Sequence, residues 1–311
     1  MTILLATDFD DLERAEWAQL LQQALPDEPI VTERSPREDR DIDIALVANP
    51  PPGALSGLAS LRLIQSLWAG VDKLLADPTI PPAVPLARMV DPAMNEAMAQ
   101  TALWAVLHLH RDFADYARQQ SHAEWRPHPQ RRTDEVAVAV LGLGQMGRAV
   151  ARRLADNGYR VTGWSQREAA LPGVSTCAGA AALPGVLGSA DVVINLLPLT
   201  PDTRGFFDAA RLAQLRAGAS IVNLARGAHV VDAALLDALD GGHLRHAVLD
   251  VFEHEPLPDG HAYWSHPRVT VLPHIAAQTD PRSAAAVAAA NVRALREGRA
   301  PLHLVDRRRG Y

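Results

Sequence analysis

Three glycines in the segment 142–147 carry the chemistry that is easiest to recognise in this sequence. They form a G-x-G-x-x-G pattern that follows the apolar run 136–141 and opens an amphipathic stretch. In a strand, turn and helix arrangement, the first glycine permits a tight turn, the second lets the backbone approach a pyrophosphate, and the third lets the helix pack on the strand. We therefore predict a dinucleotide site in which helix N–H groups face the phosphates. The residues expected there are Gly142, Gly144, Gln145, Met146 and Gly147.

The end of the next strand indicates which dinucleotide is bound. Asn157 and Gly158 end the helix, and a second strand is expected over 160–164. An acidic residue after that strand would bind the ribose of NAD and repel the extra phosphate of NADP, but Ser165 stands there. Arg167 follows and offers a fork of donors that matches a phosphate. We predict a preference for NADP(H), with NAD(H) as an alternative in which Arg167 is only a solvated loop residue.

Length and composition favour a soluble two-domain enzyme. The 311 residues exceed the size at which a single core usually splits into domains. The net charge of −6 provides no general basic surface for nucleic acid or for an anionic membrane. Cys177 is the one cysteine, which excludes an intrachain disulfide, and no signal segment or long apolar span is visible. We expect a cytoplasmic protein with no nucleic-acid or membrane partner and no metal site.

Alternating strands and helices predict an α/β fold with two Rossmann-like domains, each a doubly wound parallel sheet. Strands are expected over 2–6, 42–47, 61–67, 136–141, 160–164, 191–197, 220–224, 247–251 and 269–272. Helices are expected over 10–24, 93–118 and 281–297, after residue 70 and after the glycine turn, with a polar arm over 119–134. We assign 99–280 to the dinucleotide-binding domain, 1–98 plus 281–311 to the substrate (catalytic) domain, and the active site to a cleft between them.

Polar residues follow three successive strands of the expected dinucleotide-binding domain. Arg226 follows the strand 220–224, Asp250 and Glu255 end or follow the next strand, and His274 follows the last one. The carboxyl ends of parallel strands share one edge of a sheet, where doubly wound folds bind their ligands. We therefore expect these four side chains at the ligand-binding edge.

The segments around these residues resemble the D-2-hydroxyacid dehydrogenase family. The matching segments are 196–203, 223–227, 249–257 and 272–279, in the family order. The resemblance implies NAD(P)H-dependent reduction of a small 2-keto acid to a D-2-hydroxy acid, with Arg226, Glu255 and His274 as the catalytic set. In that set a protonated imidazole can donate a proton, a carboxylate can favour the protonated form, and a guanidinium can hold the substrate carboxylate.

The resemblance also implies further binding residues and an oligomeric state. Asp250 is expected near the nicotinamide, Pro198 and Thr203 at the cofactor, and the backbone of Ala69 and Gly70 at the substrate carboxylate. Members of the family are usually dimeric through the cofactor domain, so a homodimer is expected.

Within the family, the chain looks most like the glyoxylate/hydroxypyruvate reductase branch. The similar features are the Ser165 strand end, the tract 172–174 and the segment 123–127. One feature departs from the branch, because Ala48 and Asn49 stand where it often has a Trp-His pair. This departure predicts a pocket that admits larger substrates than glyoxylate. Two alternatives are a broader, D-lactate-like dehydrogenase and a non-catalytic nucleotide-sensing protein of the same fold.

Overall fold

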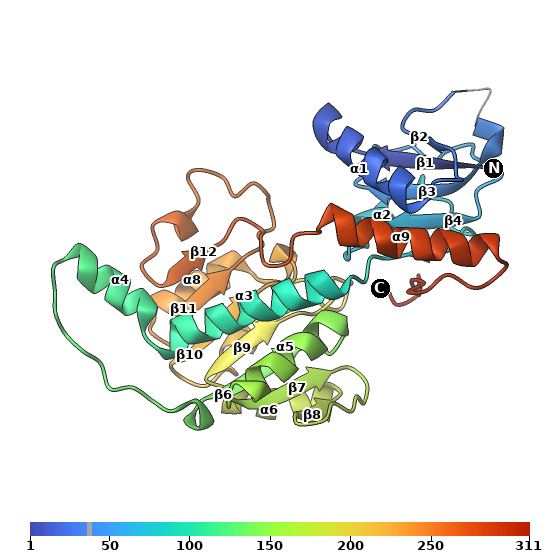
Figure 1. Ribbon diagram of the computed structural model, residues 1–311. Helices are drawn as coiled ribbons and strands as arrows, with labels where there is room; N and C mark the ends of the chain where they lie inside the picture. Colours follow the sequence, from blue (N-terminus) through green and yellow to red (C-terminus); the bar gives the residue numbers. More distant parts are fainter. Residues whose placement is uncertain (36–38) are drawn as a thin grey trace. The chain divides into compact units, whose positions relative to one another are not determined.

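Two compact units make up the protein, and each is built on its own parallel sheet (Figure 1). The computed structural model describes residues 1–35 and 39–311. The terminal unit consists of Met1–Ala93 and Thr279–Tyr311, and the central unit consists of Met94–Gln278. All strand pairs within both sheets are parallel among the described residues. The α/β class with two doubly wound sheets, predicted from the sequence, is confirmed.

The terminal unit contains a five-stranded sheet with the strand order β2-β1-β3-β4-β5. Its strands are β1 (Thr2–Thr7), β2 (Ile30–Val31), β3 (Ile42–Ala48), β4 (Leu63–Ser66) and β5 (Leu86–Ala87). Its helices are α1 (Asp11–Ala24), α2 (Asp72–Ala76) and α9 (Pro281–Arg296). Helix α1 begins at its predicted place because the Asp10 carboxylate accepts the N–H of Glu13 at 2.8 Å, and α9 likewise begins after the capping carboxylate of Asp280.

The core of the terminal unit is formed by the apolar strands and the helices beside them. Every residue of β3 and β4 is buried, as expected for inner strands of a parallel sheet covered on both faces. Helices α1 and α9 contact each other. A cluster that includes Leu55, Leu58 and Leu74 packs against the strands as well. The carboxyl ends of β1, β3 and β4 therefore meet at one edge of a rigid sheet.

The central unit contains a seven-stranded sheet with the strand order β12-β11-β10-β9-β6-β7-β8. Its strands are β6 (Ala137–Leu141), β7 (Arg160–Ser165), β8 (Ser175–Ala178), β9 (Val192–Asn195), β10 (Ala219–Asn223), β11 (Leu244–Leu249) and β12 (Val269–Val271). The chain moves outward from β6 to β7 and β8, then returns to the other side of β6 with β9. The carboxyl ends of β6 and β9 thus define the topological switch point at which doubly wound sheets bind ligands.

Helices cover both faces of this sheet. They are α3 (Pro92–His110), α4 (Phe113–Ser121), α5 (Gln145–Asp156), α6 (Leu183–Ser189), α7 (Ala209–Leu212) and α8 (Asp232–Asp240). Buried residues of α3 and α5 share one apolar cluster with the strands, and those of α6, α7 and α8 share another. Figure 1 shows α3 and α5 lying side by side across the same face.

The single helix predicted over 93–118 is wrong, because the structure has two helices there. Helix α3 ends at His110, and Asp112 adopts a left-handed conformation with φ 58° before α4 begins. Aspartate tolerates this conformation better than most residues. Its carboxylate accepts a hydrogen bond from Arg245 on β11 and pairs with His128 on the following arm. Tertiary ion pairs therefore break a segment whose local pattern is continuous helix.

Candidate active site

The glycine turn has the close approaches that its pattern predicts. Gly142 follows β6 with φ 98°, and a Cβ on it would lie 2.5 Å from the carbonyl oxygen of Leu196, which follows β9. A Cβ on Gly147 would lie 1.8 Å from the carbonyl oxygen of Gly142. Gly144 is the N-cap of α5, and a Cβ there would meet no atom within 4 Å. Two glycines are thus required by packing, while the third leaves its backbone open to a ligand at a helix N-terminus.

The residues expected to select and cover the cofactor lie on either side of this turn. Ser165 ends β7, which pairs with β6, and its hydroxyl donates to the carbonyl oxygen of Arg167 at 2.6 Å. On the other side, Thr203 donates its hydroxyl to the carbonyl oxygen of Pro198 at 2.7 Å. It also accepts the N–H of Thr200 at 2.8 Å. Thr203 therefore fixes the loop after β9 in place.

His274 and Glu255 form a direct pair at the same edge of the sheet. The Nδ1 atom of His274 lies 2.7 Å from Oε2 of Glu255, and the other carboxylate oxygen accepts the N–H of Phe252 at 2.8 Å. Burial raises the pKa of Glu255, but the hydrogen bonds from His274 and Phe252 outweigh burial and hold this pKa below its ordinary value. The carboxylate therefore stays charged and can favour an imidazolium, while Nε2 of His274 points away from it.

Asp250 holds the backbone next to His274, whereas the sequence predicted that Asp250 contacts the nicotinamide. His274 adopts φ 55°, a left-handed conformation that costs energy for a residue with a side chain. The buried carboxylate of Asp250 accepts the next two backbone N–H groups, from Ile275 at 2.7 Å and from Ala276 at 3.0 Å. Burial raises the pKa of Asp250 above its ordinary value. Asp250 thus anchors the strained turn of His274, and its expected contact with the nicotinamide stays a prediction.

Arg226 follows β10 and lies close to this pair. Its positive charge is among the causes that lower the pKa of Glu255. The next residue, Gly227, touches the loop after β11, because a Cβ on it would lie 1.8 Å from the carbonyl carbon of Phe252. The structure therefore brings Arg226, Glu255 and His274 together on the ends of three neighbouring strands.

A buried polar network supports these loops from below, and the sequence analysis did not single it out. Asn195, at the end of β9, donates to Oδ1 of Asn223 and to Nδ1 of His229, both at 2.9 Å. Asn223 donates to the carbonyl oxygen of Arg226 at 2.9 Å, and His229 contacts that of Pro198 at 3.3 Å. All three network side chains are fully buried. Asparagine at the end of an otherwise apolar strand is the sequence signal that could have revealed them.

The expected substrate loop lies in the terminal unit, between β4 and α2. Ala69 and Gly70 are partly exposed there. Ser66 supports the turn before them, since its hydroxyl accepts the N–H of Trp68 at 3.0 Å and lies 2.9 Å from the carbonyl oxygen of the same residue. Ala48, by contrast, is fully buried as the last residue of β3.

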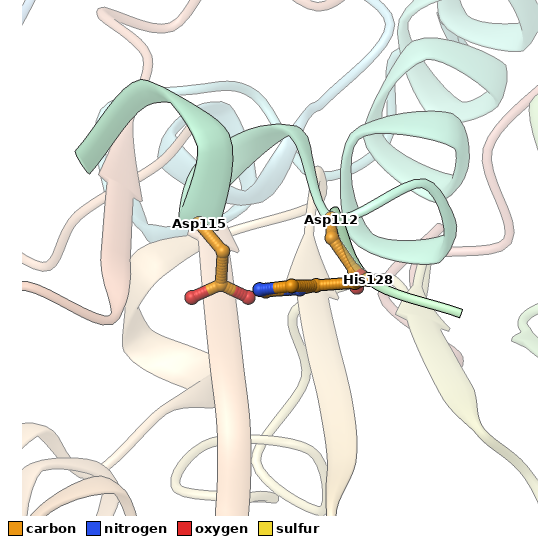
Figure 2. Close-up of side chains that lie close together, drawn as sticks. All are labelled: Asp112, Asp115 and His128. Atoms are coloured by element: carbon orange, nitrogen blue, oxygen red, sulfur yellow. The ribbon is translucent and has the colours of Figure 1, made fainter. Parts of the chain in front are cut away.

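A second cluster of titratable groups lies at the opposite edge of the central sheet, where the strands begin. Asp112, Asp115 and His128 place possible metal-ligating atoms within 4.8 Å of one another, and they are the one such group among residues 1–35 and 39–311 (Figure 2). They line a cavity of about 440 Å³ together with Arg245. Arg245 contacts both carboxylates, at 3.0 Å for Asp115. This guanidinium already supplies the positive charge that the two acids require.

Comparisons with known proteins agree with this geometry. Residues 103–276 match the family described as "D-isomer specific 2-hydroxyacid dehydrogenase, NAD binding domain". The chain is 42% identical to a glyoxylate/hydroxypyruvate reductase A of Serratia proteamaculans, over 95% of this chain and 96% of that protein. It is 39% identical to the protein of the same name from Yersinia enterocolitica, over 96% of this chain and 97% of the relative.

Solved structures similar to this chain also belong to 2-hydroxyacid dehydrogenases and reductases. A D-isomer specific 2-hydroxyacid dehydrogenase of Xanthobacter autotrophicus in complex with NADPH has a TM-score of 0.95 and 40% identity, covering 100% of this chain and 99% of the other. An NADPH-dependent glyoxylate/hydroxypyruvate reductase of Sinorhizobium meliloti in complex with NADP has a TM-score of 0.91 and 34% identity, with the same coverage. The chain belongs to the D-isomer specific 2-hydroxyacid dehydrogenase family, as its motifs predicted.

Proposed function

We propose that this protein reduces glyoxylate and hydroxypyruvate to the corresponding 2-hydroxy acids with NADPH. The observation that carries the proposal is the His274–Glu255 pair beside Arg226 at the carboxyl edge of a dinucleotide-binding sheet. An oxidoreductase of this family needs a proton donor and a carboxylate-binding cation at that place. The names of the relatives from Serratia and Yersinia and the substrates in the name of the Sinorhizobium enzyme support this choice of substrates.

The glycine turn fits a dinucleotide, because Gly144 caps a helix of 12 residues and has open space where a Cβ would stand. Gly142, Gly144, Gln145, Met146 and Gly147 would hold the pyrophosphate, Ser165 and Arg167 the phosphate on the adenine ribose, and Pro198, Thr203 and Asp250 the nicotinamide side. When bound, NADPH supplies the hydride that reduces the carbonyl carbon. The absence of an acid at Ser165 and the NADPH or NADP in the two related structures support NADP(H) over NAD(H).

The catalytic roles follow from the charges and hydrogen bonds of the three residues. His274 keeps Nδ1 on Glu255 and presents Nε2, from which it donates a proton to the carbonyl oxygen of the substrate as negative charge develops there. Glu255 orients the ring and stabilises the imidazolium. Arg226 holds the substrate carboxylate and aligns the carbonyl carbon. From the family resemblance we also propose the backbone N–H groups of Ala69 and Gly70 in the terminal unit as carboxylate donors. We assign the terminal unit to substrate binding and the central unit to the dinucleotide.

Replacement of His274 tests the proposal. His274→Ala is expected to lower kcat by about 10²–10⁴-fold, the usual contribution of general acid catalysis, while the Kd for NADPH stays near the wild-type value. Consumption of NADPH with glyoxylate and with hydroxypyruvate measures kcat, and NADPH fluorescence measures the Kd for NADPH. His254→Ala is the matched control, because His254 lies exposed in the same loop as Glu255. A His274→Ala enzyme with near wild-type turnover would remove this residue from the reaction.

We further propose that the protein forms a homodimer. Three large apolar side chains are exposed on consecutive elements. They are Trp104 on α3 (40% exposed), Phe113 on α4 (50%) and Trp125 on the arm that follows (98%). Three large exposed apolar side chains within 22 residues of sequence support an interface on this part of the chain. Sedimentation equilibrium of wild type and Trp125→Ala tests this, with a dimer expected for the first and a weaker dimer for the second. A strictly monomeric wild type contradicts it.

The place of action that we propose is the cytoplasm. The single cysteine, Cys177, is unpaired and needs no oxidising compartment. None of the helices in residues 1–35 and 39–311 is both long and apolar enough to cross a membrane. Cell fractionation with an antibody to the protein tests the assignment, and recovery in a periplasmic fraction would contradict it.

A further inference from the structure

Three aromatic rings gather at the carboxyl edge of the terminal sheet, beside the loop assigned to the substrate carboxylate. Phe9 follows β1, Trp17 lies on α1, and Trp68 follows β4. The ring of Trp68 lies 5.8 Å from that of Phe9 and 6.4 Å from that of Trp17, measured between centroids, in edge-to-face contacts. Phe9 and Trp17 stack at 5.8 Å. Such contacts hold each ring in one orientation.

The rings converge over the end of β3. Strands β1 and β4 flank β3 on either side, so they lie two strand spacings apart, about 9.6 Å. Phe9 and Trp68 follow these two strands, yet their ring centroids are only 5.8 Å apart. The two side chains therefore reach toward each other from the strands on either side of β3, whose last residue is Ala48. Ala48 is fully buried, as this arrangement requires.

This geometry bears on the larger pocket that was expected from Ala48, which stays a prediction. The expectation assumed that a small residue at this strand end leaves open space where the branch often has tryptophan. In the structure Ala48 is fully buried, and an aromatic contact joins Phe9 and Trp68, which follow the two strands that flank β3. An indole at position 48 would compete with this contact for the same volume.

Trp68 is more exposed to solvent than Phe9 and Trp17. Phe9 and Trp17 are 6% and 1% exposed, whereas Trp68 is partly exposed. Three hydrogen bonds hold the backbone of Trp68 in place. The N–H contacts the hydroxyl of Ser66, and the carbonyl oxygen contacts the same hydroxyl and accepts the N–H of Met89 at 3.1 Å. The next two residues are Ala69 and Gly70. A rigid apolar surface therefore stands directly before the proposed carboxylate-binding backbone.

We propose that Trp68 is a specificity-determining residue, the apolar wall that limits the size of the group attached to the keto carbon of the substrate. The proposal rests on the proposed function, and it names the substrate class more closely: 2-keto acids whose third carbon is absent or carries only a small substituent. With the carboxylate held at Ala69 and Gly70, a longer chain would meet an indole that is backed by Phe9 and Trp17 and cannot move aside.

Exchange of the residues at positions 48 and 68 tests the proposal. In Trp68→Ala the ratio of kcat/KM for 2-ketohexanoate to that for glyoxylate is expected to rise by about 10-fold or more, since each methylene accommodated in a pocket is worth about 10–200-fold. The double variant Ala48→Trp/Trp68→Ala is expected to return the ratio toward wild type. Ala48→Trp alone is expected to lose thermal stability, because two indoles overfill one site. Leu12→Ala, which removes an exposed apolar side chain from α1, is the control that leaves the ratio unchanged.

Binding of oxamate, an unreactive analogue of glyoxylate, separates failure of the wall from failure of the function. If wild type binds oxamate and reduces glyoxylate, but folded Trp68→Ala keeps the wild-type ratio, the wall proposal is overturned and the function stands. If wild type neither binds oxamate nor reduces any 2-keto acid, the function fails and the wall proposal fails with it. A ratio that rises in Trp68→Ala and falls again in the double variant supports both.

Discussion

Gly227→Ala adds one methyl group at a position where the structure leaves no room for it. A Cβ there would lie 1.8 Å from the carbonyl carbon of Phe252 and 2.2 Å from the nitrogen of Glu253. Both atoms are backbone, so no side-chain rotation can relieve the clash. Carbon atoms in contact lie about 3.5 Å apart, so the loop must move by more than about 1.5 Å. Phe252 is the residue whose N–H holds Glu255, and Glu255 holds His274.

The expected effect of Gly227→Ala is therefore on the chemical step. A misplacement of about 1 Å costs on the order of 100-fold in rate, so kcat is expected to fall by about that factor. The glycine turn is on other strands, and the Kd for NADPH is expected to stay within a few-fold of wild type. Gly185→Ala is the matched control, since a Cβ there meets nothing within 4 Å. Rates come from NADPH consumption with hydroxypyruvate, and thermal unfolding checks that both variants are folded. A folded Gly227→Ala enzyme with kcat within about threefold of wild type would refute the reasoning.

Three further predictions concern charge. In Glu255→Gln kcat is expected to fall, because the carboxylate charge that stabilises the imidazolium formed by His274 is lost; a kcat that matches wild type would contradict this. In Arg167→Ala the preference for NADPH over NADH is expected to drop by roughly one to two orders of magnitude, as one charge-assisted hydrogen bond is lost; kcat/KM for both cofactors measures it, and a wild type that prefers NADH would overturn the assignment. Burial lowers the pKa of His246 to about 4. The unfolded chain therefore binds a proton that the native state does not, and the free energy of unfolding is expected to fall by up to about 3 kcal/mol between pH 6.5 and pH 4. Denaturant titrations at both pH values should show a smaller drop for His246→Gln, and an equal drop would count against the prediction.

The long elements and the ligand-binding edge were predictable because their signals are local. Apolar runs identified β3, β6, β9, β10 and β11, and the glycine turn stands where its pattern places it. The parallel order of the strands then sent Arg226, Glu255 and His274 to one edge. Short elements such as β2, β5 and α7 gave too few residues for a period to be visible, and they were missed.

What the sequence could not reveal depends on contacts between distant residues. The break at Asp112 needs Arg245, which lies 133 positions further along the chain. The anchoring of the His274 turn by Asp250 needs a strained backbone that no residue pattern announces. The aromatic contact between Phe9 and Trp68 needs the strand order β1-β3-β4, which brings these residues to either side of one strand. A small residue at position 48 can therefore be followed by open space or by a neighbouring ring, and the sequence alone does not distinguish the two.

The most direct test of the central claim is the reaction of the purified protein with NADPH and hydroxypyruvate, followed by loss of NADPH absorbance and by chiral analysis of the product. The account predicts that one NADPH is consumed for each D-glycerate formed, and that glyoxylate is reduced as well. A protein that binds NADPH but consumes none with either acid, or that forms L-glycerate, would contradict it, and the first outcome would favour a nucleotide-sensing role instead.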